Sequence, residues 1–201
     1  MPFEDLAKNE LISILELIDQ AQRCFGPAQV QKLMVNAAGL LEAEFSVCGL
    51  ARTGTDGLPV VTAYVNGNYP EEWVRRYIES GYHQKDPIVR FHTKYALTQT
   101  WTDVFRQFED KDARQVVSEA SDYGLKFGFT GALYLPEISN IAMFTFAGRH
   151  NKFGAHQKRI ADILSMHFTR ALADCARESL FTAGHRLDDE GHPKGREGEA
   201  W

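Results

Sequence analysis

Four aromatic side chains and one carboxylate between residues 69 and 101 give this sequence its clearest chemical pattern. Tyr69, Trp73 and Tyr77 follow one another at intervals of four residues, and on a helix this spacing places side chains on one face. Asp86 stands directly before a proline, and Trp101 follows after a short segment. Large aromatic surfaces beside a single carboxylate suit a small, largely apolar ligand that carries a few polar atoms.

The elements that must hold these side chains can be predicted from hydrophobic periodicity and turn residues. We expect helices over about residues 4–23, 28–41, 70–80, 111–124 and 155–181, and one more that opens at Asp86-Pro87. Strands are expected over about residues 44–52, 58–65, 128–135 and 139–147, and they form two hairpins. This order of helices and strands predicts an α+β fold with an antiparallel sheet.

The composition is that of an ordinary globular domain. With 201 residues, 44% of them hydrophobic, the chain is long enough to bury a sizeable core. Its formal net charge of −5 argues against broad nucleic-acid binding by this chain alone, because such binding needs a basic surface. The three cysteines, Cys24, Cys48 and Cys175, form no CxxC pair and favour a reducing compartment. Since no signal peptide or membrane span is evident, we expect a cytoplasmic protein that does not bind a membrane.

Signatures of catalysis and of metal binding are weak in this sequence. The motifs G-x-S-x-G and H-E-x-x-H and the P-loop are missing, and the seven histidines are scattered. We therefore expect no enzyme activity, no metal and no cofactor. The alternative from a different functional class is a hydrolase of a lactone or an amide, with Asp86 as the base.

A longer pattern resembles the signal-binding domain of the LuxR-type quorum-sensing regulators. It consists of Asn68-Tyr69-Pro70, Trp73, Tyr77, Tyr82, Asp86-Pro87, Trp101, Glu119-Ala120-Ser121, Gly124-Leu125, Gly128 and Thr130. The order and spacing of these residues are specific, and the resemblance covers about residues 5–180. It implies an α-β-α sandwich around a central antiparallel sheet of about five strands. It also implies that an N-acyl-homoserine lactone binds between the sheet and one helical layer.

The resemblance assigns a role to each polar side chain of the first pattern. Asp86 would accept a hydrogen bond from the amide N–H of the signal, Trp73 would donate to the lactone carbonyl, and Tyr69 would donate to the acyl carbonyl. Local sequence alone favours plainer roles for the same residues. An Asp before Pro is a common helix N-cap, a lone Trp is more often a core residue, and Tyr69 stands in a turn.

Further hydroxyl and apolar residues complete the predicted site. Strand alternation places Thr145 on one face with Met143 and Ala147, and the resemblance implies that its hydroxyl contacts the ligand. The remaining positions would line the pocket, although each also fits a plain core role: Tyr77, Ile88, Trp101, Val116, Ala120, Leu125 and Thr130. One departure is Ala132, where the family usually has a proline, and it leaves the local strand geometry open.

The C-terminal residues differ from the rest of the chain. Behind a domain of residues 1–181, residues 182–201 are polar, glycine-rich and charged, and we expect them to be disordered. Full-length members of the family continue into a helix-turn-helix DNA-binding domain at about this point. We favour a naturally short member that binds no DNA itself.

Such a short member would form a homodimer, or a heterodimer with a full-length LuxR-type regulator that it antagonises, because a dimer with one helix-turn-helix reads only one half-site. Two alternatives remain for the whole chain. It could be a ligand-binding domain cut from a longer transcription factor, or a dimerisation module whose pocket has lost its ligand.

Overall fold

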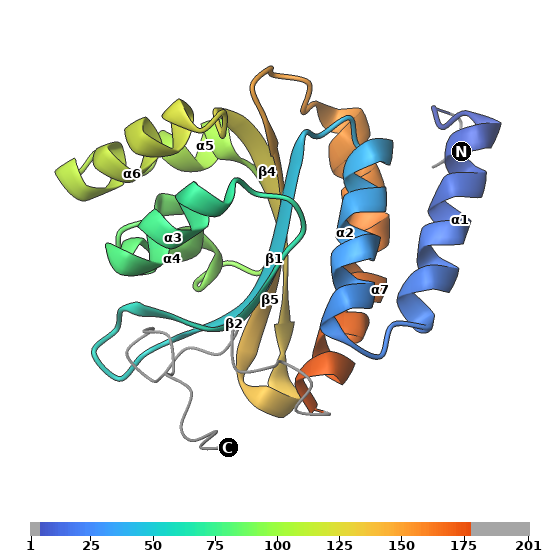
Figure 1. Cartoon of the computed structure of the whole chain (residues 1–201), viewed down its shortest axis with the longest axis horizontal. Coiled ribbons are helices and arrows are strands. Elements are labelled where there is room, and N and C mark those ends of the chain that lie inside the picture. The colour runs from blue at the N-terminus through green and yellow to red at the C-terminus, as the bar shows by residue number, and fades with distance from the viewer. Residues whose placement is uncertain (1–4, 178–201) are drawn as a thin grey trace, which may run out of the picture.

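The computed structural model describes residues 5–177, and Figure 1 shows the helices and strands of this range. The N-terminal half contains α1 (Lys8–Gln22), α2 (Pro27–Leu40), β1 (Phe45–Thr53), β2 (Pro59–Asn66), α3 (Glu71–Glu79) and α4 (Pro87–His92). The C-terminal half contains β3 (Gln99–Thr100), α5 (Trp101–Phe105), α6 (Lys111–Asp122), β4 (Phe127–Leu135), β5 (Asn140–Gly148) and α7 (Ala155–Arg177). Two short 3-10 helices, η1 (Tyr82–Gln84) and η2 (Pro136–Ile138), precede α4 and β5.

The strands of the described range form one antiparallel sheet of five strands, in the order β2-β1-β5-β4-β3. β1 joins the two hairpins, because it pairs with β2 on one side and with β5 on the other. The register of β1 and β5 sets Val47 opposite Thr145 and Gly49 opposite Met143. The predicted α+β class and the sheet of about five strands are confirmed.

The segment before Trp101 differs from the prediction of a plain connection. It contains β3, whose two residues pair with β4, and it leads directly into α5. The Thr100 hydroxyl caps α5 by accepting a hydrogen bond from the Asp103 N–H (3.3 Å). A strand of two residues is too short to show a periodic pattern, so the sequence could not reveal it.

Local caps set the ends of the helices that carry the site. Asp86 caps α4 by accepting from the Ile88 N–H (2.7 Å), as its position before a proline predicts. Asp110 caps α6 in the same way, through the Ala113 N–H (3.0 Å). Beyond the other end of α6, Gly124 has a φ of 87°, in the left-handed region where glycine is favoured.

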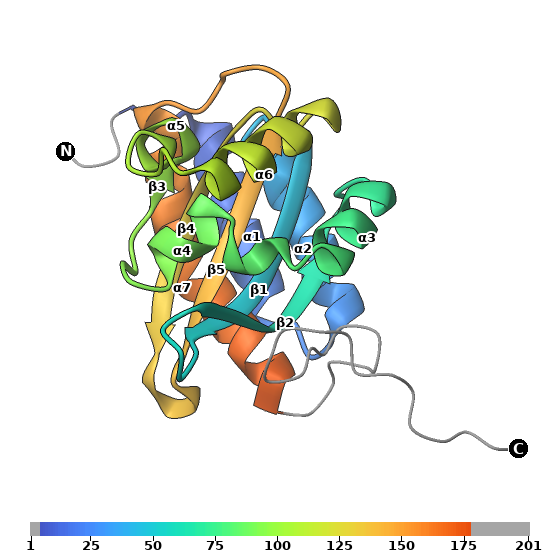
Figure 2. The same ribbon diagram turned by 90° about the vertical axis from the view of Figure 1, so that its left-hand side faces the viewer.

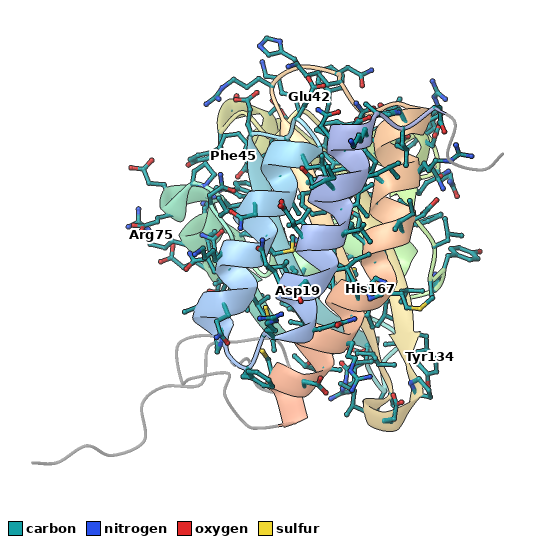
Figure 3. All side chains as sticks on the ribbon, turned by 90° about the vertical axis from the view of Figure 1, so that its right-hand side faces the viewer. Asp19, Glu42, Phe45, Arg75, Tyr134 and His167 are labelled. Atoms are coloured by element: carbon teal, nitrogen blue, oxygen red, sulfur yellow. The ribbon has the colours of Figure 1, made fainter. Side chains whose placement is uncertain are left out.

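Two helical layers cover the two faces of the sheet, so the architecture is an α-β-α sandwich. α1, α2 and α7 lie on one side and α3, α4, α5 and α6 on the other (Figures 1 and 2). Figure 3 views the first layer, with Asp19 labelled on α1 and His167 on α7. The larger core cluster lies under this layer, whereas a second cluster, rich in aromatic residues, lies between the sheet and the other layer.

The ends of the predicted elements shift by a few residues. The first helix begins at Lys8 rather than at residue 4, and the strands shift by about one residue. β4 runs unbroken through Ala132, which pairs with Met143, so the missing proline leaves the strand regular. Residues 178–181 of the predicted last helix and the predicted tail, 182–201, lie outside the described residues. Among residues 5–177, no helix combines the length and the apolar character of a membrane span.

Candidate functional site

A cavity of about 170 Å³ lies between the sheet and the layer of α3, α4, α5 and α6. Side chains from both hairpins form its floor, and aromatic and aliphatic side chains from the helices form its walls. The lining residues are Val47, Cys48, Gly49, Val61, Tyr64, Tyr69, Trp73, Val74, Tyr77, Ile78, His83, Asp86, Ile88, Val89, Trp101, Phe105, Val116, Val117, Ala120, Leu125, Met143 and Thr145. Asp86 is the one carboxylate in this lining.

Ten of the eleven residues predicted for the site lie around this cavity. They are Tyr69, Trp73, Tyr77, Asp86, Ile88, Trp101, Val116, Ala120, Leu125 and Thr145. The exception is Thr130, which is fully buried and is not part of the lining. Whether the ten residues contact a ligand stays a prediction, because a place in the wall is not a contact with a bound molecule.

Two asparagines hold the turn that brings Tyr69 to the cavity. The Asn66 side chain accepts from the Tyr69 N–H (2.8 Å) and donates to the Tyr69 carbonyl (3.1 Å). The Asn68 side chain accepts from the Ser46 N–H (2.8 Å) and donates to the Glu44 carbonyl (2.7 Å), so it pairs with β1 as a further strand residue would. The turn residues Asn66 and Asn68 therefore hold the backbone that directs the Tyr69 side chain.

Asp86 accepts two hydrogen bonds of normal geometry within the described residues, and the Val89 backbone N–H also favours its charged form. Its Oδ1 accepts from the Ile88 N–H (2.7 Å), and its Oδ2 accepts from the Tyr77 phenol (2.8 Å). A carboxylate has about four acceptor positions, so these two bonds leave capacity for a further donor. The N-cap role and a role in ligand binding are therefore compatible.

Burial sets the protonation of the polar groups around the cavity. It raises the pKa of Asp86 above its usual value, and the bonds from Tyr77 and Ile88 counteract part of this rise. Burial and the nearby Asp86 carboxylate raise the pKa of Tyr69 and of Tyr77 well above 10, so both phenols keep their protons. The cavity lining thus holds the protonated phenols of Tyr69 and Tyr77 and, when Asp86 is ionised, one acceptor that is costly to leave unpaired.

Trp73 is held by three tyrosines. Its ring lies 5.7 Å from that of Tyr77, 5.9 Å from that of Tyr82 and 5.5 Å from that of Tyr123, in edge-on and tilted arrangements. Only 3% of its surface is exposed. Trp73 is therefore both a core residue and part of the cavity wall, because its ring packs in the aromatic cluster and also lines the cavity.

Trp101, Thr130 and Thr145 form a chain of hydrogen bonds in which Trp101 and Thr130 are buried and Thr145 is partly buried. The Trp101 indole N–H donates to Thr130 Oγ1 (3.2 Å), and Thr130 Oγ1 lies 3.0 Å from Thr145 Oγ1. The two threonines are direct cross-strand neighbours on β4 and β5. The Trp101 ring reaches this position because Gly128 has no side chain, since a Cβ there would meet the ring at 2.9 Å.

An ion pair outside the aromatic cluster joins α3 to α6. Arg76 Nε donates to Glu119 (3.1 Å), and both groups surround the Tyr82 hydroxyl together with Gln115. The hydrogen bonds from Arg76, Tyr82 and Gln115 lower the pKa of Glu119 to about 2. The pair fastens the two helices whose inner faces carry Trp73, Val116 and other residues of the cavity wall.

Sequence reasoning missed twelve lining residues, mostly on the sheet and beside predicted positions. They are Val47, Cys48, Gly49, Val61, Tyr64, Val74, Ile78, His83, Val89, Phe105, Val117 and Met143. Strand alternation already places Met143 on the same face as Thr145, and the pairing of β1 with β5 then adds Val47 and Gly49. That pairing joins segments about a hundred residues apart, so a local sequence pattern cannot predict it.

The chemistry of the cavity is that of recognition by hydrogen bonds within an apolar enclosure. Among the described residues, no group of three or more His, Cys, Asp or Glu side chains is placed to hold a metal ion. The lining brings one carboxylate, one imidazole, phenols, indoles and a hydroxyl together with aliphatic side chains. Such a wall suits a ligand with an apolar part and a compact polar head.

Comparison with known proteins assigns this fold and cavity to a family. Residues 26–172 match the model of the autoinducer binding domain. The chain belongs to the autoinducer-binding domain family. The resemblance predicted from the sequence is confirmed, and in LuxR-type regulators this domain binds the quorum-sensing signal, an acyl-homoserine lactone.

The relatives of this autoinducer-binding domain are transcriptional regulators. The chain is 32% identical over 120 residues to the transcriptional activator VanR of Vibrio anguillarum, a match that covers 60% of this chain and 48% of VanR. It therefore spans about half the length of that relative.

Solved structures show the same fold. The N-acylhomoserine lactone-dependent LuxR-family factor CepR2 of Burkholderia cenocepacia has a TM-score of 0.68 at 22% identity, over 83% of this chain and 98% of that one. Escherichia coli SdiA has a TM-score of 0.67 at 20% identity, over 86% of this chain and 71% of that one.

Proposed function

We propose that the cavity binds an N-acyl-homoserine lactone and that the chain thereby acts in quorum-sensing transcription. The observation that carries this proposal is Asp86, an acceptor with unused capacity in a mostly apolar enclosure that also holds Tyr69 and Trp73. The lactone head offers one amide N–H and two carbonyl oxygens. Asp86 accepts from the amide, Trp73 donates to the lactone carbonyl, and Tyr69 and Thr145 serve the acyl carbonyl.

The acyl chain supplies most of the affinity in this scheme. Ile88, Val116, Ala120, Leu125 and Met143 form apolar wall around the cavity. Burial of a chain there contributes about 0.8 kcal/mol for each CH₂. The polar contacts then set the choice of head group, because a ligand without the amide N–H leaves a buried carboxylate short of a partner.

The test is thermal unfolding with a panel of acyl-homoserine lactones of short, medium and long acyl chains. At a ligand concentration of about 100 times Kd, binding adds about 2.7 kcal/mol, which raises Tm by about 5–10 °C for a chain of this size. We expect a rise that depends on chain length and that Asp86→Ala and Trp73→Phe strongly reduce. A wild-type protein whose Tm no lactone changes would refute the proposal.

Asp86→Ala also removes a helix cap, so it needs a matched control. Asp110 caps α6 through the same kind of bond and is not part of the cavity lining. Asp110→Ala removes the cap of α6 together with the ion pair to Arg90, so it should lower Tm while keeping the rise caused by the lactone. This comparison separates loss of the cap from loss of the ligand contact.

The lactone should also be released from the protein chemically intact. A hydrolase with Asp86 as base would consume the lactone, and mass spectrometry after prolonged incubation distinguishes the two functions. We expect intact lactone, because the described lining pairs Asp86 with a phenol and a backbone amide and holds no second carboxylate. The relatives point the same way, since they are transcriptional regulators.

The regulatory step is association with a second autoinducer-binding domain, in a homodimer or with a full-length LuxR-type regulator. A heterodimer with one helix-turn-helix would read one half-site of an operator and would antagonise the full-length protein. Light scattering of the purified chain with and without lactone measures the homodimer. Titration of this chain into a full-length regulator bound to its operator measures antagonism, which shows as loss of the DNA complex.

A further inference from the structure

The hydrogen-bonded chain Trp101–Thr130–Thr145 constrains the direction of its hydroxyl protons. An indole N–H can only donate, so Thr130 Oγ1 is the acceptor of the 3.2 Å bond from Trp101. Thr130 has one proton of its own, and Thr130 is fully buried. Within the described residues, the acceptor recorded for that proton is Thr145 Oγ1, 3.0 Å away.

Only one arrangement of protons gives both Trp101 and Thr130 an acceptor. If Thr145 donated to Thr130, the Thr130 proton would be buried without an acceptor, which costs free energy because its bond to water is lost on folding. If Thr130 donates to Thr145, both Trp101 and Thr130 are satisfied. The proton of Thr145 is then free to turn toward the cavity, which Thr145 lines.

We propose that Thr130 and Trp101 are positioning residues that orient the Thr145 hydroxyl as a hydrogen-bond donor into the cavity. This inference rests on the proposed function and adds a condition on the ligand. The ligand must place an acceptor, such as the carbonyl oxygen of an acyl group, opposite Thr145. A methylene at that point leaves the Thr145 proton without a partner, so the site selects against it.

The indirect role of Thr130 gives a distinctive pattern in a double-mutant cycle. Calorimetric titration would use N-octanoyl-L-homoserine lactone and N-(3-oxooctanoyl)-L-homoserine lactone with Thr130→Val, Thr145→Val and the double variant. We expect Thr145→Val to weaken binding about tenfold or more and Thr130→Val about threefold to tenfold, the size of one lost or loosened hydrogen bond. The double variant should bind no more weakly than Thr145→Val, because Thr130 acts only through Thr145.

Two further variants control for structural effects. Thr130→Ser keeps the hydroxyl and should restore binding close to that of the wild type. Thr169→Val removes another buried threonine hydroxyl, one that bonds to a carbonyl of its own helix on the far side of the sheet, and should not alter lactone affinity. A Thr130→Val effect of equal size with and without the Thr145 hydroxyl would overturn the inference.

A ligand-free measurement keeps the inference separate from the proposed function. In the proton spectrum of the lactone-free protein, we expect a protected Thr130 hydroxyl proton, which Thr145→Val exposes to exchange, and a rapidly exchanging Thr145 hydroxyl proton. A protected Thr145 hydroxyl proton would refute the inference even if the lactone binds. If no lactone binds, the receptor proposal fails, while this measurement still decides the direction of the hydrogen bonds.

Discussion

At the scale of the residue, two helix caps with the same chemistry have opposite electrostatic settings. Asp86 and Asp110 each accept a hydrogen bond from a backbone N–H in the first turn of a helix. Asp110 lies near solvent and pairs with Arg90 (2.8 Å), and the Ala113 amide and Arg90 lower its pKa. Asp86 lies against the cavity, where burial raises its pKa. One carboxylate therefore stabilises the folded protein at neutral pH, and the other costs stability there.

This contrast predicts that Asp86→Asn raises the stability of the ligand-free protein at neutral pH. Because the folded-state pKa of Asp86 is raised, its contribution to stability is fully present below the unfolded-state value near 3.8 and is lost as pH rises through the folded-state value. The gain from Asn should therefore disappear toward acid pH. Lactone affinity should fall about tenfold to a hundredfold at the same time, since a bond to a charged acceptor is lost.

Urea unfolding across pH, with calorimetric titration of the lactone, measures both effects. Asp110→Asn is the matched control, and it should lose stability at neutral pH because the pKa of Asp110 is lowered. Its lactone affinity should not change. An Asp86→Asn variant that is less stable than the wild type at every pH would show that the buried charge of Asp86 does not cost stability.

At the scale of the element, an ion pair joins α3 and α6, two helices that carry parts of the cavity wall. We predict that Glu119→Gln lowers Tm by about 1–3 °C at neutral pH, the size of a partly exposed ion pair in a chain of this length. Because the pKa of Glu119 is lowered from 4.5 to about 2, its contribution is present above pH 4.5 and is lost as pH falls toward 2. The Tm values of variant and wild type should therefore converge in acid.

The same substitution should speed the release of the lactone. α3 and α6 both carry parts of the cavity wall, so loosening their contact should lower the barrier to opening. Stopped-flow dissociation of the lactone measures this rate. Arg76→Gln should act alike, and the double variant should add little to either single change, since both remove one pair. Additive effects would show that the two residues act independently.

A second prediction at this scale concerns the contact between β4 and α5. A Cβ at Gly128 would lie 2.5 Å from the Phe146 carbonyl oxygen and 2.9 Å from the Trp101 ring. Gly128→Ala should therefore displace Trp101 and destabilise the protein by about 1–3 kcal/mol. Gly39→Ala on the exposed side of α2, where nothing lies within 4 Å, should instead stabilise it by about 0.5–1 kcal/mol. Chemical unfolding of both variants checks the opposite signs.

The elements and the helical part of the site follow from short-range patterns in the sequence. Spacing by four puts Trp73 and Tyr77 on one face of α3, and the position before a proline makes Asp86 a cap. The pairing of distant strands cannot be predicted from such patterns. It decides that Val47 and Gly49 join the cavity floor. Thr130 shows the same limit, because the sequence predicts it in the lining while in the structure it is fully buried, bonded to Trp101 and outside the lining.

At the scale of the whole molecule, the response to acid divides into two ranges of pH. Four carboxylates with lowered pKa values, Glu10, Glu44, Asp110 and Glu119, lose their stabilising contributions only below about pH 4.5. A buried histidine adds a loss of stability at higher pH, between about 6.5 and 4.5. His92 is fully buried, and neither of its ring nitrogens has a hydrogen bond of normal geometry among the described residues.

Burial lowers the pKa of His92 from 6.5 to about 4, and the Tyr95 backbone counteracts only part of this. The unfolded chain therefore takes up a proton as pH falls through 6.5, while the folded protein resists until about pH 4. The fall in stability over this range is about 3 kcal/mol, from about 1.36 kcal/mol for each pKa unit. His92 thus makes the whole fold less stable in mild acid.

His92→Leu should remove this loss, because a side chain of similar size without polar atoms has no proton to gain and leaves no buried donor unpaired. We predict that the unfolding free energy of this variant stays nearly level between pH 7 and 4.5, where the wild type loses about 2–3 kcal/mol. His150→Leu, at an exposed position, should keep the slope of the wild type. A slope unchanged in His92→Leu would show that another group senses mild acid. If the slope is lost, the ligand-free protein should stay folded over a wider range of pH.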